Sequence, residues 1–176
     1  MKSFFPFCLL NLLLLMSLNS FAQQDKSKRP SPPATVTQKV GGTTISINYS
    51  QPSVKGRTIG VDLEPLPGKV WRAGANEATV FEVDKDLVVE GKVLSKGKYG
   101  FFVLTGDKTW TLIFNKTWDQ WGAFTYKEAD DVLRVRARDK EVDKVTERLT
   151  YTISSDGNIT ISWGNKEINF TVQEKH

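Results

Sequence analysis

The sequence predicts an all-β fold, an antiparallel β-sandwich of roughly ten strands with a jelly-roll-like arrangement. Three observations lead to this prediction. Apolar and polar residues alternate with a period of two beyond residue 35, the alternating runs are rich in β-branched and aromatic residues, and turn-forming residues separate them. No segment has a helical period and no repeat of fixed length is visible. Many short strands joined by tight turns favour two sheets packed around a filled core.

Each predicted strand places its large apolar side chains on one face. In the first clear run, Ile45, Ile47 and Tyr49 point one way and the polar residues between them point the other way. Five later runs repeat this pattern, with inward residues Trp110, Leu112 and Phe114; Leu133, Val135 and Ala137; Leu149, Tyr151 and Ile153; Ile159, Ile161 and Trp163; and Ile168, Phe170 and Val172. Residues 128–131 are the one place where we expect a turn of helix.

Short polar and glycine-rich segments mark the turns between these runs. The turn signals are Gly41-Gly42, Ser95-Lys96-Gly97, Gly106-Asp107, Ser155-Asp156-Gly157-Asn158 and Gly164-Asn165. The last two predict that the C-terminal part is a meander of hairpins.

The chain divides into three predicted regions. Lys2, the apolar run over residues 4–16 and the small residues Ser20 and Ala22 predict a secretory signal peptide over residues 1–22. The apolar run is too short to span a bilayer, so no transmembrane segment is expected after cleavage. Residues 23–34 are polar and proline-rich, which predicts a disordered tether, and residues 35–176 form the β-sandwich domain. The expected location is periplasmic or extracellular.

The composition excludes several kinds of chemistry. The single cysteine, Cys8, lies in the signal peptide, so the mature chain has no disulfide and no cysteine nucleophile. The single histidine is the last residue, His176, which excludes Ser-His pairs and histidine-based zinc sites. Glu82, Asp84 and Asp86 alternate as in a calcium loop, but the glycine that such a loop needs is missing. We therefore expect no metal and no cofactor. The net charge of +4 is too small to predict nucleic-acid binding.

Two segments interrupt the alternation. Residues 51–68 contain three prolines and three glycines, and residues 115–127 carry two tryptophans, a phenylalanine and a tyrosine. Both predict irregular loops outside the sheets, and long loops in compact domains are often functional.

Four motifs, in this order, carry a resemblance to a known family. They are residues 50–57 (Ser-Gln-Pro-Ser-Val-Lys-Gly-Arg), residues 68–79 (Gly-Lys-Val-Trp-Arg-Ala-Gly-Ala-Asn-Glu-Ala-Thr), residues 114–116 with 120–123, and residues 131–135. Together they resemble the signature of secreted bacterial proteins grouped as domain of unknown function 2911. The resemblance implies an exported bacterial β-protein and implies no activity.

The stretch around Trp71, Arg72, Asn76 and Glu77 is the first candidate ligand site. Trp71 could stack on a ligand, Arg72 could form a fork for a carboxylate or phosphate, and Asn76 with Glu77 could bind hydroxyl groups. The alternative is structural, with the tryptophan in the core, Arg72 paired with an acid, and Asn76 in a turn.

The second candidate is the aromatic segment with Trp118, Asp119, Trp121 and Tyr126. Exposed aromatic side chains on a loop are suited to stacking against sugar rings, and the polar residues between them could supply hydrogen bonds. The alternative is a lid whose aromatic side chains cover the end of the core.

These observations predict an exported, non-catalytic binding module or envelope-associated protein. The sequence does not identify the ligand; a small molecule or a glycan is the candidate, with no nucleic acid, and the oligomeric state is not predicted. One alternative is a glycan hydrolase that uses Glu77 and Asp119 as a carboxylate pair, which requires a separation of about 5 to 9.5 Å. The other is a purely structural envelope protein.

Overall fold

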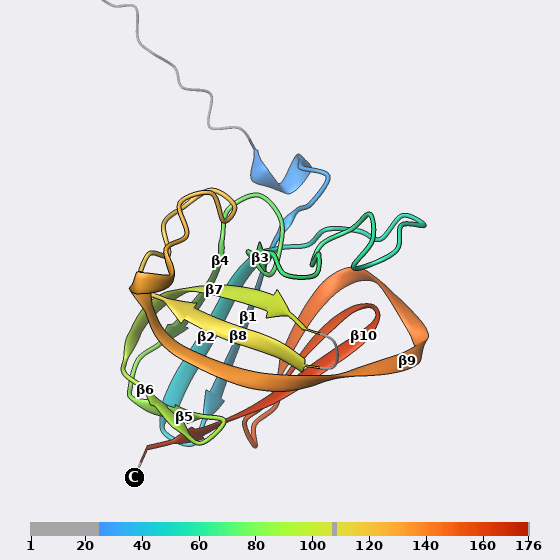
Figure 1. Ribbon diagram of the computed structural model, residues 1–176. Helices are drawn as coiled ribbons and strands as arrows, with labels where there is room; N and C mark the ends of the chain where they lie inside the picture. Colours follow the sequence, from blue (N-terminus) through green and yellow to red (C-terminus); the bar gives the residue numbers. More distant parts are fainter. Residues whose placement is uncertain (1–24, 107–108, 176) are drawn as a thin grey trace, which may run out of the picture.

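The computed structural model describes residues 25–106 and 109–175, and the predicted signal peptide and His176 lie outside them. The fold consists of antiparallel strands and two short 3-10 helices (Figure 1). The strands are β1 (Pro33–Val40), β2 (Thr43–Ser50), β3 (Val70–Trp71), β4 (Thr79–Val83), β5 (Leu87–Val89), β6 (Lys92–Leu94), β7 (Gly97–Thr105), β8 (Thr109–Asn115), β9 (Asp131–Ile153) and β10 (Asn158–Glu174). The helices are η1 (Lys26–Lys28) and η2 (Glu128–Asp130), and η2 is the helical turn predicted from the sequence.

The predicted antiparallel all-β fold is confirmed, and the strands belong to one open sheet. Its order is β1-β2-β4-β7-β8-β9-β10-β5-β6, and β3 pairs with β7 beside this path. The sheet folds over itself. Between ring centroids, Tyr151 on β9 lies 4.6 Å from Tyr49 on β2, and Phe170 on β10 lies 6.0 Å from Phe101 on β7. In both pairs the two strands are not neighbours in the sheet. The two layers expected of a sandwich are therefore two parts of a single sheet.

The core lies between these two parts of the sheet. Every inward side chain predicted from the alternation is at most 8% exposed. At its centre the ring of Phe114 meets the rings of Phe81 and Phe101 edge to face, at 5.0 and 5.2 Å between centroids. This is the geometry that aromatic pairs prefer, and close packing of this kind gives the cysteine-free domain its stability.

The C-terminal part differs from the predicted meander of hairpins, because it forms one long hairpin of β9 and β10. The predicted turn at residues 155–158 joins the two strands, but the predicted turn at Gly164-Asn165 lies inside β10. There Gly164 faces Thr146 while Lys166 faces Glu141, so β9 carries extra residues that bulge out of the ladder. Gly164 has a φ of +58°, a conformation that glycine adopts without a steric penalty. A turn and a bulge use the same residue types, and this explains the wrong prediction.

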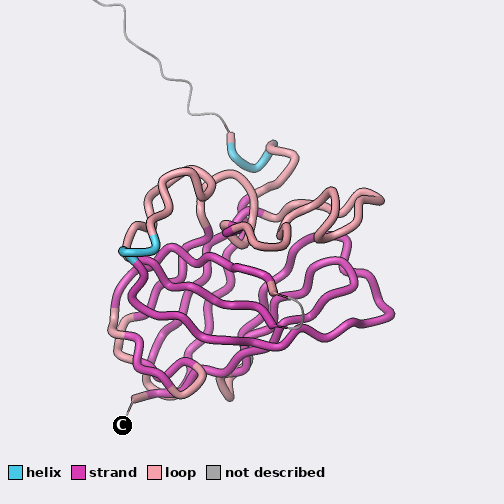
Figure 2. The backbone as a smooth tube through the Cα atoms, viewed as in Figure 1, coloured by secondary structure: helices cyan, strands magenta, loops and turns pink. Residues whose placement is uncertain are grey.

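The long loops gather at one end of the sheet, at the top of Figure 2. They are the proline-rich loop (residues 51–69), the central loop (residues 72–78) and the aromatic loop (residues 116–127), and residues 25–32 lie beside them. Both segments predicted to leave the sheet do so. None of the helices in the described part of the chain has the length and apolarity needed to cross a bilayer.

Two phenylalanines allow the core to be tested against the loops. Phe101 is fully buried, whereas Phe124 on the aromatic loop is 83% exposed. We expect Phe101→Ala to lower the free energy of unfolding by about 3–5 kcal/mol, because it removes buried surface and leaves a cavity. Phe124→Ala should change it by less than about 0.5 kcal/mol. Denaturant titrations of the two variants measure the difference, and similar losses in both would contradict this description of the core.

Candidate functional site

The central loop has a strained backbone that the core holds in place. Ala73 adopts a φ of +53°, which is costly for a residue with a side chain. Its carbonyl oxygen accepts hydrogen bonds from the hydroxyls of Tyr151 at 2.7 Å and Thr79 at 3.0 Å. The indole N–H of Trp71 donates to the carbonyl oxygen of Gly74 at 3.0 Å. Several buried contacts therefore determine the shape of this loop, as is common at functional sites.

The structure places Trp71 in the core, where it is 2% exposed. Its indole N–H is already bonded within the central loop. Trp71 therefore lies in the core, as the structural alternative predicts, and not at a ligand-stacking surface.

Asn76 and Glu77 lie against the N-terminal segment. One guanidinium nitrogen of Arg29 donates to both carboxylate oxygens of Glu77 at 3.0 and 2.9 Å, and the ammonium of Lys26 lies 2.9 Å from the same carboxylate. The side-chain amide of Asn76 donates to the carbonyl oxygen of Ser31 at 3.0 Å. Residues 25–32, expected to be part of a disordered tether, therefore contact the domain through charged and polar groups.

These contacts keep Glu77 ionised. Partial burial raises the pKa of its carboxyl group, but hydrogen bonds from Lys26, the backbone and Arg29 outweigh burial and lower the pKa from 4.5 to about 2. A carboxyl group in this state cannot donate a proton at neutral pH, so Glu77 is unsuited to be the general acid of the alternative hydrolase.

A hydrogen-bond network anchors the aromatic loop at its base. The carboxylate of Asp131 accepts from the amide of Asn115 at 2.7 Å, from the hydroxyl of Tyr126 at 2.7 Å and from Nε of Arg134 at 2.7 Å. The Asn115 amide also donates to the carbonyl oxygen of Lys127 at 2.9 Å. Burial, assisted by Asp131, raises the pKa of Tyr126 to about 12. Tyr126 is therefore an anchor of the loop, as in the structural alternative.

Main-chain hydrogen bonds join the aromatic loop to the central loop. The N–H of Ala78 donates to the carbonyl oxygen of Gln120 at 3.0 Å, and the N–H of Gly122 donates to the carbonyl oxygen of Asn76 at 3.0 Å. The two candidate sites predicted separately are thus neighbours in the fold.

Three large aromatic side chains of the aromatic loop reach solvent. Trp118 is 38% exposed, Trp121 53% and Phe124 83%. Cations lie over two of the rings: Nζ of Lys98 is 4.7 Å from the ring centroid of Trp118, and Cζ of Arg29 is 5.8 Å from that of Trp121. We call these three aromatic side chains the aromatic patch.

A pocket of about 300 Å³, which we call the Arg72 pocket, lies between the proline-rich and central loops. Nε of Arg72 is fully buried and has no hydrogen-bond partner among residues 25–106 and 109–175. A methyl group built on Gly122 would lie 3.7 Å from an end nitrogen of Arg72, so the side chain also reaches the aromatic loop. The pocket is lined by Ser31, Pro52, Arg57, Asp62, Leu63, Glu64, Trp71, Arg72, Gly74, Ala75 and Trp163.

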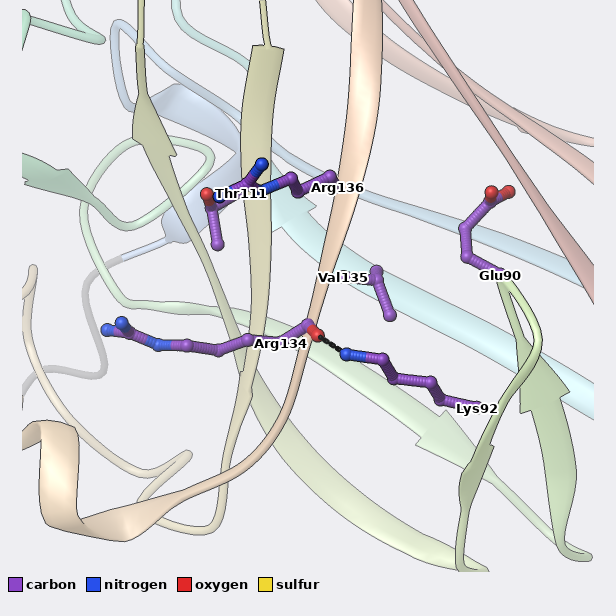
Figure 3. Close-up of a pocket in the computed structure, with 6 residues that line it drawn as sticks. All are labelled: Glu90, Lys92, Thr111, Arg134, Val135 and Arg136. Carbon is purple, nitrogen blue, oxygen red and sulfur yellow. Dashed lines mark hydrogen bonds between the residues drawn. The ribbon is translucent and has the colours of Figure 1, made fainter.

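A larger hollow of about 560 Å³ lies beside β9, but its charged groups do not converge. Figure 3 shows Arg134 and Arg136 pointing away from Glu90, toward the other side of the strand. Lys92 donates to the carbonyl oxygen of Arg134 at 3.1 Å, which occupies its ammonium group. This arrangement does not form a site with several groups aimed at one ligand.

Asp119, the second acid of the alternative hydrolase, is exposed on the aromatic loop. Within the part of the chain that the structure describes, it makes no salt bridge, and no three metal-binding side chains gather in one place. No hydrogen bond or ion pair joins Asp119 to Glu77 in the described part of the chain. The carboxylate of Glu77 is instead bound by Lys26 and Arg29, which indicates a structural role.

Sequence reasoning missed the N-terminal contribution to this region. Arg29 binds Glu77 and lies over Trp121, and Ser31 binds Asn76. Charge complementarity between Glu77 and the basic residues before Pro30 was the only available signal, and it does not specify a pairing across about 50 residues.

Replacing Glu77 tests whether the N-terminal segment is bound. The folded-state pKa of about 2 lies below the ordinary 4.5, so the carboxylate stabilises the fold above about pH 4.5 and this contribution is lost as the pH falls toward 2. Because the side chain is 39% exposed, solvent screening limits the effect, and we expect Glu77→Gln to cost about 1 kcal/mol at pH 7.

Unfolding titrations at pH 7 and near pH 2.5 measure this difference, with Asp119→Asn as the control. The cost of Glu77→Gln should shrink at the lower pH, and the control should be near neutral at both. An unchanged cost at both values would show that the ion pairs do not form.

The comparisons with known proteins identify a family and give no activity. Neither a curated protein nor a solved structure matches the chain. One family model matches residues 31–172, which include all the strands except the C-terminal end of β10. The chain belongs to the family described as "Protein of unknown function (DUF2911)".

Proposed function

We propose that this protein is an exported, non-catalytic module that binds a carbohydrate through its aromatic loop. The observation that carries the proposal is the aromatic patch: Trp118, Trp121 and Phe124 are exposed on a loop whose base is hydrogen-bonded on both sides. Export rests on the predicted signal peptide, which lies outside the described residues.

The chemistry of a sugar matches such a surface. The C–H groups on one face of a sugar ring form a flat apolar surface that packs against an aromatic ring, while its hydroxyls remain free for hydrogen bonds. The loop carries polar side chains between the rings, and the side-chain oxygen of Gln120 accepts a hydrogen bond from the Thr125 hydroxyl at 3.0 Å. Three large aromatic side chains exposed on one loop form an apolar surface of the kind that marks binding sites, which supports a role in ligand binding.

Anchoring favours binding because little freedom is lost when a ligand docks. The network around Asp131 and the main-chain bonds to the central loop hold the aromatic loop in one conformation. A preordered surface avoids the entropic cost of ordering a flexible loop at the moment of binding.

The surroundings of the acidic residues support a non-catalytic role. Glu77 is engaged by two cations and stays ionised, and Asp119 is exposed to solvent. A glycosidase needs one carboxyl group kept protonated by its surroundings and a second acid facing it. No observation favours that arrangement here.

Removing the aromatic patch should abolish binding and leave the fold intact. We expect Trp121→Ala and Phe124→Ala each to weaken glycan binding by about tenfold or more, since each removes one stacking surface. Isothermal titration calorimetry with a panel of neutral and acidic oligosaccharides measures the affinities, and thermal melting checks the fold.

Val93→Ala provides the control, because Val93 is 51% exposed on β6, at the opposite end of the sheet from the aromatic loop. It should bind like the parent. If the parent binds no member of the panel, or if the aromatic-loop variants bind as well as the control, the proposal is wrong.

A further inference from the structure

Arg72 differs from Arg57 and Arg29 because its guanidinium has no partner among the residues that the structure describes. Arg57, in the same pocket, donates from Nε to the carbonyl oxygen of Val54 at 3.0 Å and from an end nitrogen to that of Ser53 at 2.6 Å. Arg29 is bound to Glu77. For Arg72, no hydrogen bond or salt bridge is present within residues 25–106 and 109–175, and its Nε is buried. Burying a polar nitrogen without a partner is costly, and a ligand that accepts a hydrogen bond from this guanidinium would offset that cost.

The strained central loop holds this guanidinium at the pocket wall. Arg72 directly precedes Ala73, whose carbonyl oxygen is bonded by the hydroxyls of Tyr151 and Thr79. Burial lowers the pKa of Arg72, and the nearby Glu64 carboxylate partly offsets this. Glu64 itself accepts a hydrogen bond from the N–H of Leu66 at 2.9 Å. Its charge is therefore held within the proline-rich loop and not paired directly with Arg72.

The charge balance of the Arg72 pocket selects among anions. Its walls carry Arg57 and Arg72 together with Asp62 and Glu64, so the formal charges cancel. The planar fork of a guanidinium matches both carboxylate and phosphate. Because the charges on the walls cancel, a bound phosphate with two negative charges leaves a larger net charge in the half-buried pocket than a carboxylate with one, and burying the larger charge costs more. The pocket therefore favours a carboxylate.

We propose that Arg72 is a specificity-determining residue that binds the carboxylate of an acidic sugar, a uronic acid residue, in the Arg72 pocket. This inference rests on the proposed function, since the aromatic patch binds the sugar ring and the Arg72 pocket binds only its acid group. The two surfaces are adjacent, because Arg72 reaches Gly122, which directly follows Trp121 in the aromatic loop. A volume of about 300 Å³ is at the lower end for small-molecule sites and is sufficient for the acid group of one sugar residue of a longer chain.

A pair of ligands that differ only in charge tests the inference. The probes are a trimer of galacturonic acid and the same trimer with its carboxyl groups methyl-esterified, titrated by calorimetry into the parent and into Arg72→Gln. We expect the parent to bind the acid at least about tenfold more tightly than the ester, because a charged hydrogen-bonded pair is lost with the ester. Arg72→Gln should bind both with the affinity of the ester.

Arg138→Gln, which removes an exposed arginine from β9, is the matched control and should keep the parent's preference. Inorganic phosphate is a further probe; if it competes with the acid at equal concentration, the pocket is a general anion site and the inference is wrong. If Arg72→Gln does not fold, Arg72→Lys replaces it, because lysine keeps the charge and loses the planar fork. The Arg72→Lys variant should still prefer the acid over the ester, but by a smaller factor than the parent.

The two proposals fail in different ways. If the parent binds acid and ester equally, carbohydrate binding stands and the role of Arg72 is wrong. If Arg72→Gln weakens acid and ester by the same factor, Arg72 has only a structural role, which also contradicts the inference. If the parent binds neither these probes nor any other glycan, the proposed function itself is wrong.

Discussion

The side chain of Tyr151 connects the core of this protein to its candidate site. Its ring meets Tyr49 across the folded sheet, and its hydroxyl donates to the carbonyl oxygen of Ala73 at the strained turn of the central loop. Full burial, with Tyr49 close by, raises the pKa of Tyr151 well above 10, so the hydroxyl keeps its proton and remains a donor. One buried side chain thus contacts both parts of the sheet and helps to shape the loop that carries Arg72.

This coupling explains why the loops at one end of the sheet can act as a rigid surface. The central loop is shaped by buried hydroxyls, and the aromatic loop is bonded to it through the main chain of Asn76 and Gly122. The Asp131 network supports the aromatic loop from the other side. The aromatic patch and the Arg72 pocket therefore share one support, and a ligand can contact both without reorganising either.

The N-terminal segment, residues 25–32, contacts the domain, which its composition did not predict. Lys26 and Arg29 neutralise Glu77, and Arg29 also lies over the exposed ring of Trp121. A polar, proline-rich segment has little apolar surface to bury, so it is expected to be disordered. A few charge-assisted hydrogen bonds to one carboxylate are sufficient to place it against the domain.

The sequence by itself determined the fold class and the inward faces, because alternation in a strand depends only on neighbouring residues. Ile45, Trp163 and Phe170 are buried where that rule places them. Only the tertiary structure decided that the strands form one sheet folded over itself and that Gly164 lies inside β10 opposite a bulge of β9, since both depend on which strand pairs with which. It also decided that Trp71 belongs to the core while Arg72 reaches a pocket, because alternation places the two side chains on opposite faces but does not say what covers each face.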